Sequence, residues 1–126
     1  MPHQTTFNPE LQIIETKYSG NISIEELKSL TIEIAKLATE NNCFLTLGDF
    51  REAFLQLSTV DIYELPQTLS DALKSSGLMI YKFKRALVVA KSAKDFLFFQ
   101  TVAANQGQTT KVFYDVEEAK EWLTKK

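Results

Sequence analysis

The chain has few of the residues that cross-link or interrupt a fold. Its 126 residues include one cysteine, one histidine, three prolines and four glycines. The single cysteine, Cys43, cannot form an internal disulfide, which is typical of a reducing compartment. So few prolines and glycines exclude a long flexible linker, and neither an internal repeat nor a low-complexity segment is present. We therefore expect one domain over residues 1–126.

Strong charge and long apolar runs are also missing. The net charge is −2 and the lysines are scattered, so we expect no nucleic-acid partner. No apolar run approaches the roughly 20 residues that span a bilayer, so we expect no transmembrane segment. Residues 1–6 lack the charged start and apolar stretch of a signal peptide. These absences predict a cytoplasmic location.

No set of residues that requires a particular chemistry can be found. His3 lies in a terminal segment, and Cys43 opens an apolar run without a histidine partner. CxxC, HExxH, EF-hand, GxGxxG and Walker patterns are all absent. We therefore expect no catalytic residue, no metal site and no cofactor, and a protein that is not an enzyme.

What the sequence does contain is a regular alternation of strand and helix patterns. Strands are predicted at residues 4–7, 11–19, 43–50, 85–90 and 111–114, and helices at 24–41, 59–76, 95–106 and after Asp115. The order β-β-α-β-α-β-α-β-α predicts an α/β fold with a mixed, mostly parallel sheet of about five strands and flanking helices. The first two strands would form an antiparallel hairpin at one edge.

Several local signals refine this prediction. Ser23 and Glu26 form a capping-box pattern at the first helix. Gly20 and Asn21 are expected to break the second strand, and residues 51–57 to form a loop. Pro66 predicts a kink or a broken first turn in the second helix. Arg85 begins its strand, where a surface ion pair is expected.

Polar residues follow the ends of the central strands. The carboxyl ends of parallel strands meet at one edge of a sheet, where ligands often bind. This edge is a candidate site for an anion or a protein partner, formed by Asp49, Arg51, Ser58, Thr59, Lys91, Ser92 and Lys94. The alternative is that Asp49 pairs with Arg51, the hydroxyls cap helices and the lysines are solvated.

The third helix is apolar around most of its circumference, which is more than one core face requires. The residues concerned include Phe96, Phe98, Phe99 and Val102. A second copy of the chain could cover them, which would make a homodimer, or they could be buried inside one chain, for example under residues 78–81. They could also line an apolar ligand pocket together with Leu78 and Met79, with a polar end near Arg51 or Lys91.

Four segments, together with the order of elements, carry a resemblance to a known family. They are residues 18–20 before the capped helix, Asp49-Phe50-Arg51, residues 85–90, and residues 112–123. On these the chain resembles the STAS-like, SpoIIAA-like proteins related to bacterial anti-sigma-factor antagonists, whose fold is similar to CRAL-TRIO domains. The resemblance implies a phosphorylatable serine at a helix start, which Ser58 and Thr59 match by position. The aspartate and glycine of that motif are absent around them.

These observations favour a non-catalytic regulatory or protein-interaction domain that forms a homodimer and binds a protein partner. The alternative is a carrier or sensor of a small apolar or amphiphilic, lipid-like ligand, held in a pocket near the third helix. An enzyme with unconventional residues is the third hypothesis.

Overall fold

Strands and helices follow one another in the predicted order in the computed structural model, which describes residues 3–125. The strands are β1 (His3–Asn8), β2 (Ile13–Ile22), β3 (Leu45–Leu55), β4 (Lys84–Val88) and β5 (Thr109–Phe113). The helices are α1 (Ile24–Asn41), α2 (Thr59–Lys74), α3 (Lys94–Asn105) and α4 (Val116–Thr124), with a short 3-10 helix η1 (Ile80–Lys82).

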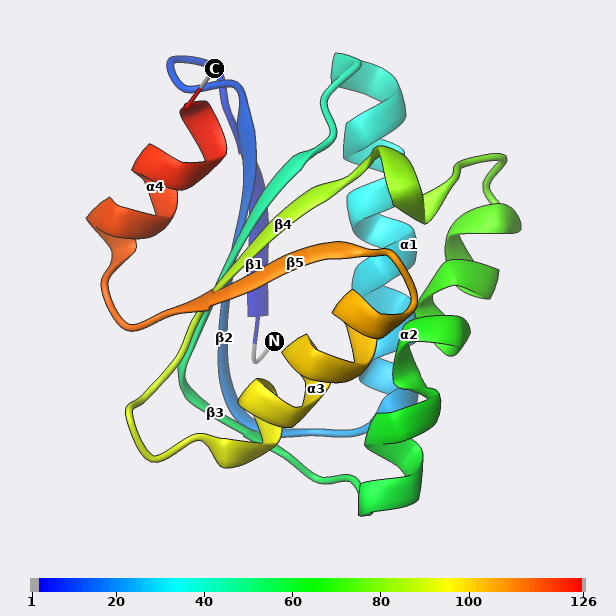
Figure 1. Cartoon of the computed structure of the whole chain (residues 1–126). Coiled ribbons are helices and arrows are strands. Elements are labelled where there is room, and N and C mark those ends of the chain that lie inside the picture. The colour runs from blue at the N-terminus through cyan, green and yellow to red at the C-terminus, as the bar shows by residue number, and fades with distance from the viewer. Residues whose placement is uncertain (1–2, 126) are drawn as a thin grey trace.

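The five strands form one sheet in the order β1-β2-β3-β4-β5 (Figure 1). β1 pairs antiparallel with β2, and the other three pairs are parallel. The antiparallel hairpin at the edge and the parallel remainder confirm the predicted α/β fold.

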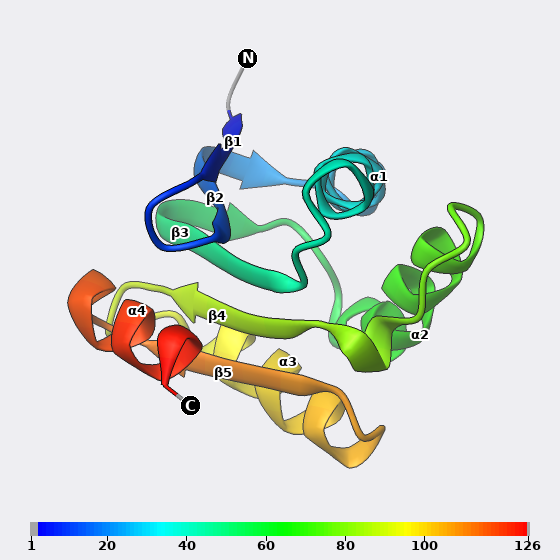
Figure 2. The same ribbon diagram turned by 90° about the horizontal axis from the view of Figure 1, so that it is seen from above.

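The helices are distributed unevenly over the two faces of the sheet. α1, α2 and α3 cover one face, and α4 alone packs on the other (Figure 2). Side chains alternate between the faces along each strand. The core is consequently split into a large cluster under α1, α2 and α3, which includes Ile14 and Phe50, and a smaller one under α4, which includes Ile13 and Phe113.

Side-chain caps fix the starts of three helices. Ser23 and Ser58 accept hydrogen bonds from the backbone N–H of Glu26 and Asp61, and both form complete capping boxes. Asp115 caps α4 in the same way, by accepting from the N–H of Glu118. These caps leave each helix beginning at the carboxyl edge of the sheet, directly after a strand.

Tyr18 connects β2 to the first turn of α1. Its hydroxyl donates a hydrogen bond to the carboxylate of Glu26. Burial, followed by this hydrogen bond, raises the pKa of Tyr18 to about 12. The same hydrogen bond holds the pKa of Glu26 below its ordinary value.

Two strands extend further than local sequence signals predict. β2 continues through Gly20 and Asn21, which pair with Ala53 and Phe54 in β3. The expected break after residue 19 and most of the expected loop at 51–57 are therefore wrong. Hydrogen bonds between the two parallel strands outweigh the turn preference of glycine and asparagine, and Gly20 adopts a φ of +87° within the strand.

The second helix contains Pro66, as predicted, and the kink expected there stays a prediction. Pro66 lies inside α2, which continues as a helix on both sides of it, and the ring is fully buried. Packing of the ring against the core compensates for the backbone donor that proline lacks.

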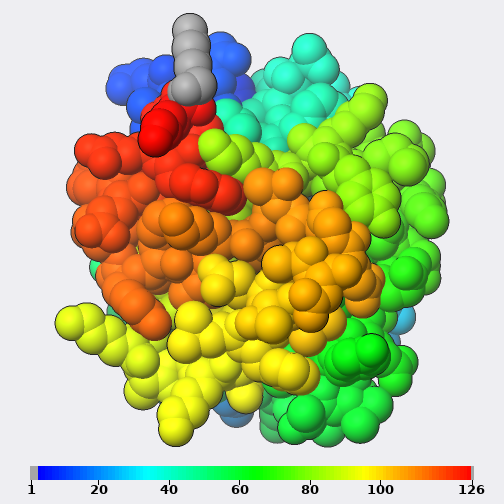
Figure 3. All heavy atoms as spheres, viewed as in Figure 1, coloured from blue at the N-terminus to red at the C-terminus, as the bar shows by residue number. Residues whose placement is uncertain are grey.

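The face formed by α3, β5 and α4 is closely packed in the space-filling view (Figure 3). The segment that joins β4 to α3 projects from this face at the lower left.

Within residues 3–125, no helix is long and apolar enough to cross a membrane.

Candidate functional site

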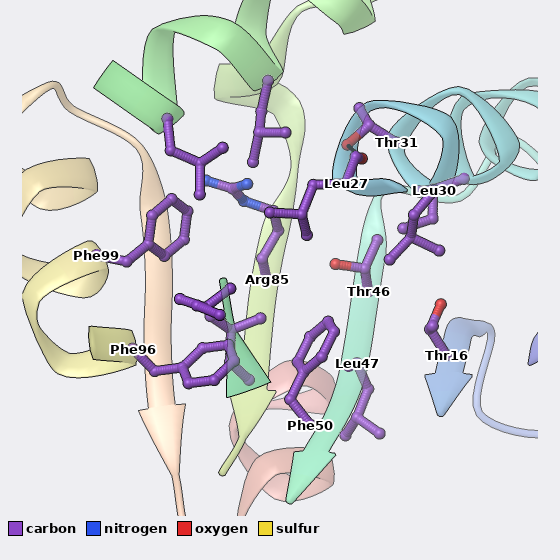
Figure 4. Close-up of a pocket in the computed structure, with 16 residues that line it drawn as sticks. Thr16, Leu27, Leu30, Thr31, Thr46, Leu47, Phe50, Arg85, Phe96 and Phe99 are labelled. Carbon is purple, nitrogen blue, oxygen red and sulfur yellow. Dashed lines mark hydrogen bonds between the residues drawn. The ribbon is translucent and has the colours of Figure 1, made fainter. Parts of the chain in front are cut away.

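A cavity of about 90 Å³ lies between the sheet and the three helices that cover its larger cluster. The sheet forms its floor, and α1, α2 and α3 form its walls (Figure 4). Apolar side chains make up most of the lining, and its polar side chains are Thr16, Thr31, Thr46 and Arg85.

Strand register places three polar residues in one row on this face of the sheet, and two of them, Thr46 and Arg85, line the cavity. Thr46 on β3 is the register partner of Arg85 on β4, and Arg85 is the partner of Thr110 on β5. Register partners in neighbouring strands point to the same face. Figure 4 shows the Thr46 side chain directed toward Arg85. A polar row thus crosses a face that is otherwise largely apolar.

Arg85 extends from β4 toward α2, between Phe99 and Leu27 (Figure 4). Its Nη2 donates a hydrogen bond of 2.7 Å to Oε1 of Gln108, and Nε2 of Gln108 donates one of 3.1 Å to the carbonyl oxygen of Pro66. The guanidinium carbon lies 5.8 Å from the centre of the Phe99 ring. Gln108 therefore links the guanidinium to α2.

The guanidinium of Arg85 has fewer partners than its donors require. Within residues 3–125 no carboxylate forms an ion pair with it, and its buried Nε has no hydrogen-bond partner. The buried hydroxyl of Thr110, its neighbour in the row, is also without a partner. Burial lowers the pKa of Arg85 to about 10, which still leaves it charged at neutral pH. The predicted surface ion pair is therefore wrong.

Arg85 and Leu87 lie on a central strand beneath helices, yet both remain only partly buried. Both line the cavity, which leaves part of each side chain accessible. A smaller cavity of about 50 Å³ adjoins it and shares Thr31, Ile34, Thr46, Leu69 and Arg85 in its lining. Arg85 thus borders both spaces.

Aromatic rings close the end of the cavity nearest the carboxyl edge. Phe50 and Phe96 stack with their ring centres 5.5 Å apart. Gly48 makes room for this arrangement, because a Cβ built there would lie 2.3 Å from an edge carbon of Phe50. The missing side chain at Gly48 therefore keeps both the Phe50 ring and the floor of the cavity in place.

The predicted carboxyl-edge site is only partly brought together. Arg51 donates from Nε and Nη2 to the two carboxylate oxygens of Asp49, at 2.9 and 2.7 Å. This hydrogen bonding holds the pKa of Asp49 below its ordinary value and raises that of Arg51. Arg51, Ser92 and Lys94 line a surface hollow of about 290 Å³.

The other residues of that edge lie apart from the hollow. Ser58 caps α2, Thr59 begins it, and both are exposed. Lys91 is exposed in the turn after β4. Leu55 and Phe96 line both the hollow and the cavity, so they separate the two spaces.

Most of the apolar residues of α3 are buried within one chain. Phe96, Phe99 and Val102 are buried, and Phe98 is partly buried. Phe96 and Phe99 line the cavity, whereas Phe98 and Val102 do not. Leu78 and Met79, expected in the lining, are also outside it, and the polar end is at Arg85 rather than at Arg51 or Lys91.

Sequence reasoning missed Arg85 and Thr46. The available signal was alternation: Arg85 and Leu87 share one face of a strand predicted to be buried on both, and Thr46 interrupts a similar apolar run.

Within residues 3–125, no group of three or more histidine, cysteine, aspartate or glutamate side chains could hold a metal ion.

Comparison with solved structures identifies the fold. The chain is similar to the crystal structure of an uncharacterized protein from the DUF3478 family of Shewanella loihica PV-4, which is described as having a SpoIIAA-like fold. The TM-score is 0.57 at 19% sequence identity, over 96% of this chain and 91% of that one. The resemblance to SpoIIAA-like proteins is thereby confirmed for the fold. No family model matches the sequence, and the search of curated proteins found no match.

Proposed function

We propose that this chain is a non-catalytic regulatory domain that binds a small, largely apolar molecule in the cavity under α1, α2 and α3. The observation that carries the proposal is the cavity itself, of about 90 Å³ and lined mainly by leucine, isoleucine and phenylalanine. Protein interiors are otherwise packed to the density of organic crystals, so a space of this size in a small core is unusual.

The lining supports binding rather than catalysis. Its polar side chains are three threonines and one arginine. None of them titrates near neutral pH, and none combines a nucleophile with a general base. Cys43 is buried and donates to the carbonyl oxygen of Gln12, and Cys43 is not part of the lining.

The position of the cavity supports a regulatory role. α1, α2 and α3 each contribute to its walls, so an occupant would contact all three helices at once. A ligand that binds one arrangement of these helices better than another shifts the population toward it. The same three helices also form outer surface that a protein partner could bind. Ligand binding would change this surface and thereby the affinity for the partner.

An NMR titration with toluene tests the proposal. The only tryptophan, Trp122, lies on α4 beyond the sheet, so its fluorescence is a poor reporter and leucine methyl signals are preferable. We expect saturable shifts at Leu27, Leu65 and Leu87, which line the cavity. Absence of saturable shifts at these methyls would overturn the proposal.

A matched pair of variants on α1 locates the binding. Ile34 lines the cavity, whereas Ile32, on the same helix, is 51% exposed. Ile34→Trp should fill the space and abolish the toluene shifts, while Ile32→Trp should leave them unchanged. Circular dichroism confirms folding, because overpacking a core costs typically about 1–3 kcal/mol. Equal binding by both variants would place toluene elsewhere.

A further inference from the structure

Arg85 places a positive charge in the interior without a counter-ion among the described residues. A charged group that is largely removed from water without a counter-ion is destabilising. Within the described residues the guanidinium makes one hydrogen bond, from Nη2 to Gln108, and its Nε has none. An anion inside the cavity would supply the missing partner.

A purely structural role does not explain an arginine at this position. Gln108 needs one donor for its Oε1, and the bond from its Nε2 to the carbonyl oxygen of Pro66 does not involve Arg85. A neutral amide side chain could donate to Gln108 without placing a charge in the core. The positive charge faces the Phe99 ring at 5.8 Å but has no counter-ion in the described part of the chain, and an anion would supply one.

Resting on the proposed ligand-binding function, we propose that the ligand is a small monocarboxylic acid whose carboxylate binds Arg85 and Thr46. The guanidinium would donate to the carboxylate, and the Thr46 hydroxyl, which faces Arg85 from the neighbouring strand, would donate a further hydrogen bond (Figure 4). The apolar part of the acid would lie toward Leu87, Phe96 and Phe99.

The donor set favours a carboxylate over a phosphate. One guanidinium and one hydroxyl match the charge and the two oxygens of a carboxylate. A phosphate carries a charge of about −1.5 to −2 at neutral pH and three acceptor oxygens, which would need a second cation. Among the described residues, Arg85 is the only cationic side chain in the lining.

The size of the space limits the apolar part. The main cavity measures about 90 Å³ and the adjoining one about 50 Å³, and Arg85 borders both. An engineered apolar cavity of roughly 150 Å³ in another protein holds benzene. Each of the two spaces is smaller than that cavity, so the ligand should carry at most one ring or a short aliphatic chain, and a long-chain fatty acid is too large for this arrangement of the helices.

Calorimetric titration with benzoate, benzamide and toluene tests the assignment. Benzamide has nearly the shape of benzoate without its charge, and toluene lacks polar atoms. The wild type should bind benzoate about ten- to a hundredfold more tightly than benzamide, because hydrogen bonds to charged groups contribute more than neutral ones. Arg85→Met should weaken benzoate binding by a similar factor and retain toluene binding.

A second variant and pH refine the test. Thr46→Val, which removes the hydroxyl at nearly constant shape, should weaken benzoate binding about two- to tenfold and leave toluene binding unchanged. Benzoate binding should also fall as the pH drops below about 4, where carboxylic acids become protonated.

The outcomes separate the two proposals. If toluene binds while benzoate shows no preference over benzamide, or if Arg85→Met leaves benzoate affinity unchanged, the carboxylate assignment is overturned and the apolar site stands. If none of the three compounds binds the wild type, the proposed function itself is overturned. Toluene binding by Arg85→Met shows that this variant has folded with its cavity intact.

Discussion

Arg85 carries a positive charge that no carboxylate in residues 3–125 neutralises. Residues that serve ligand binding often lower the stability of the ligand-free protein, because their favourable interactions form only when the ligand is bound. The proposed carboxylate site would make Arg85 such a residue, and its Nε has no hydrogen-bond partner, while burial lowers its pKa to about 10. Stability and binding should therefore respond to its removal in opposite ways.

Arg85→Met in the ligand-free protein should leave the free energy of unfolding unchanged or raise it by up to about 2 kcal/mol, because a buried charge is replaced by an apolar side chain of similar length. Urea denaturation measures the change. Leu65→Ala, at a buried leucine that also lines the cavity, should lower stability by about 2–5 kcal/mol and serves as the reference. A loss of about 3 kcal/mol or more in Arg85→Met would instead identify a structural arginine.

Local sequence signals identified many individual residues but not this one. The capping residues Ser23 and Asp115 could be predicted, because a cap depends on residues within one turn of helix. The environment of Arg85 depends on which side chains of α1, α2 and β5 come near it. The sequence contains 16 acidic residues, any of which could form an ion pair with Arg85. The residues next to Arg85 in the sequence do not reveal that no such ion pair forms.

At the scale of elements, Ser58 has a definite structural role. Its hydroxyl accepts from the N–H of Asp61 at 3.1 Å, and the Asp61 carboxylate accepts from the N–H of Ser58 at 3.3 Å. A phosphate on Ser58 would stand beside this carboxylate, and repulsion between the two would disfavour the cap. Ser58 is therefore first of all the N-cap residue of α2.

Ser58→Ala should lower the free energy of unfolding by about 1 kcal/mol, the usual cost of losing a helix cap. Thr59→Ala, at the exposed first residue of the helix, should change stability by less than about 0.5 kcal/mol. Thermal and urea unfolding of the two variants give the comparison. Equal effects would argue against the capping role.

The order and type of the elements could be predicted, but several boundaries could not. Helical periodicity with a capping box identified α1 from its own residues. The extension of β2 past Gly20 depends on its pairing with Ala53 in β3, which is a contact between distant parts of the chain. The position of Pro66 inside α2 could be predicted from the helical spacing around it, whereas the full burial of its ring depends on tertiary packing, which local propensity does not reveal.

At the scale of the whole molecule, the uneven distribution of helices explains where the cavity lies. A single helix, α4, closes the smaller cluster on one face, whereas three helices must meet over the other. Their side chains leave a space where α1, α2 and α3 converge above the row of Thr46 and Arg85. The proposed ligand site is therefore an interior space of the single domain itself.

The most direct test of this site is an isotope-filtered NOE experiment on the labelled protein with unlabelled benzoate. We predict contacts between the benzoate ring protons and the methyl groups of Leu65, Leu69 and Leu87, which line the cavity from α2 and β4. Contacts confined to exposed side chains such as Ile32, or no contacts at saturating benzoate, would contradict binding in the cavity.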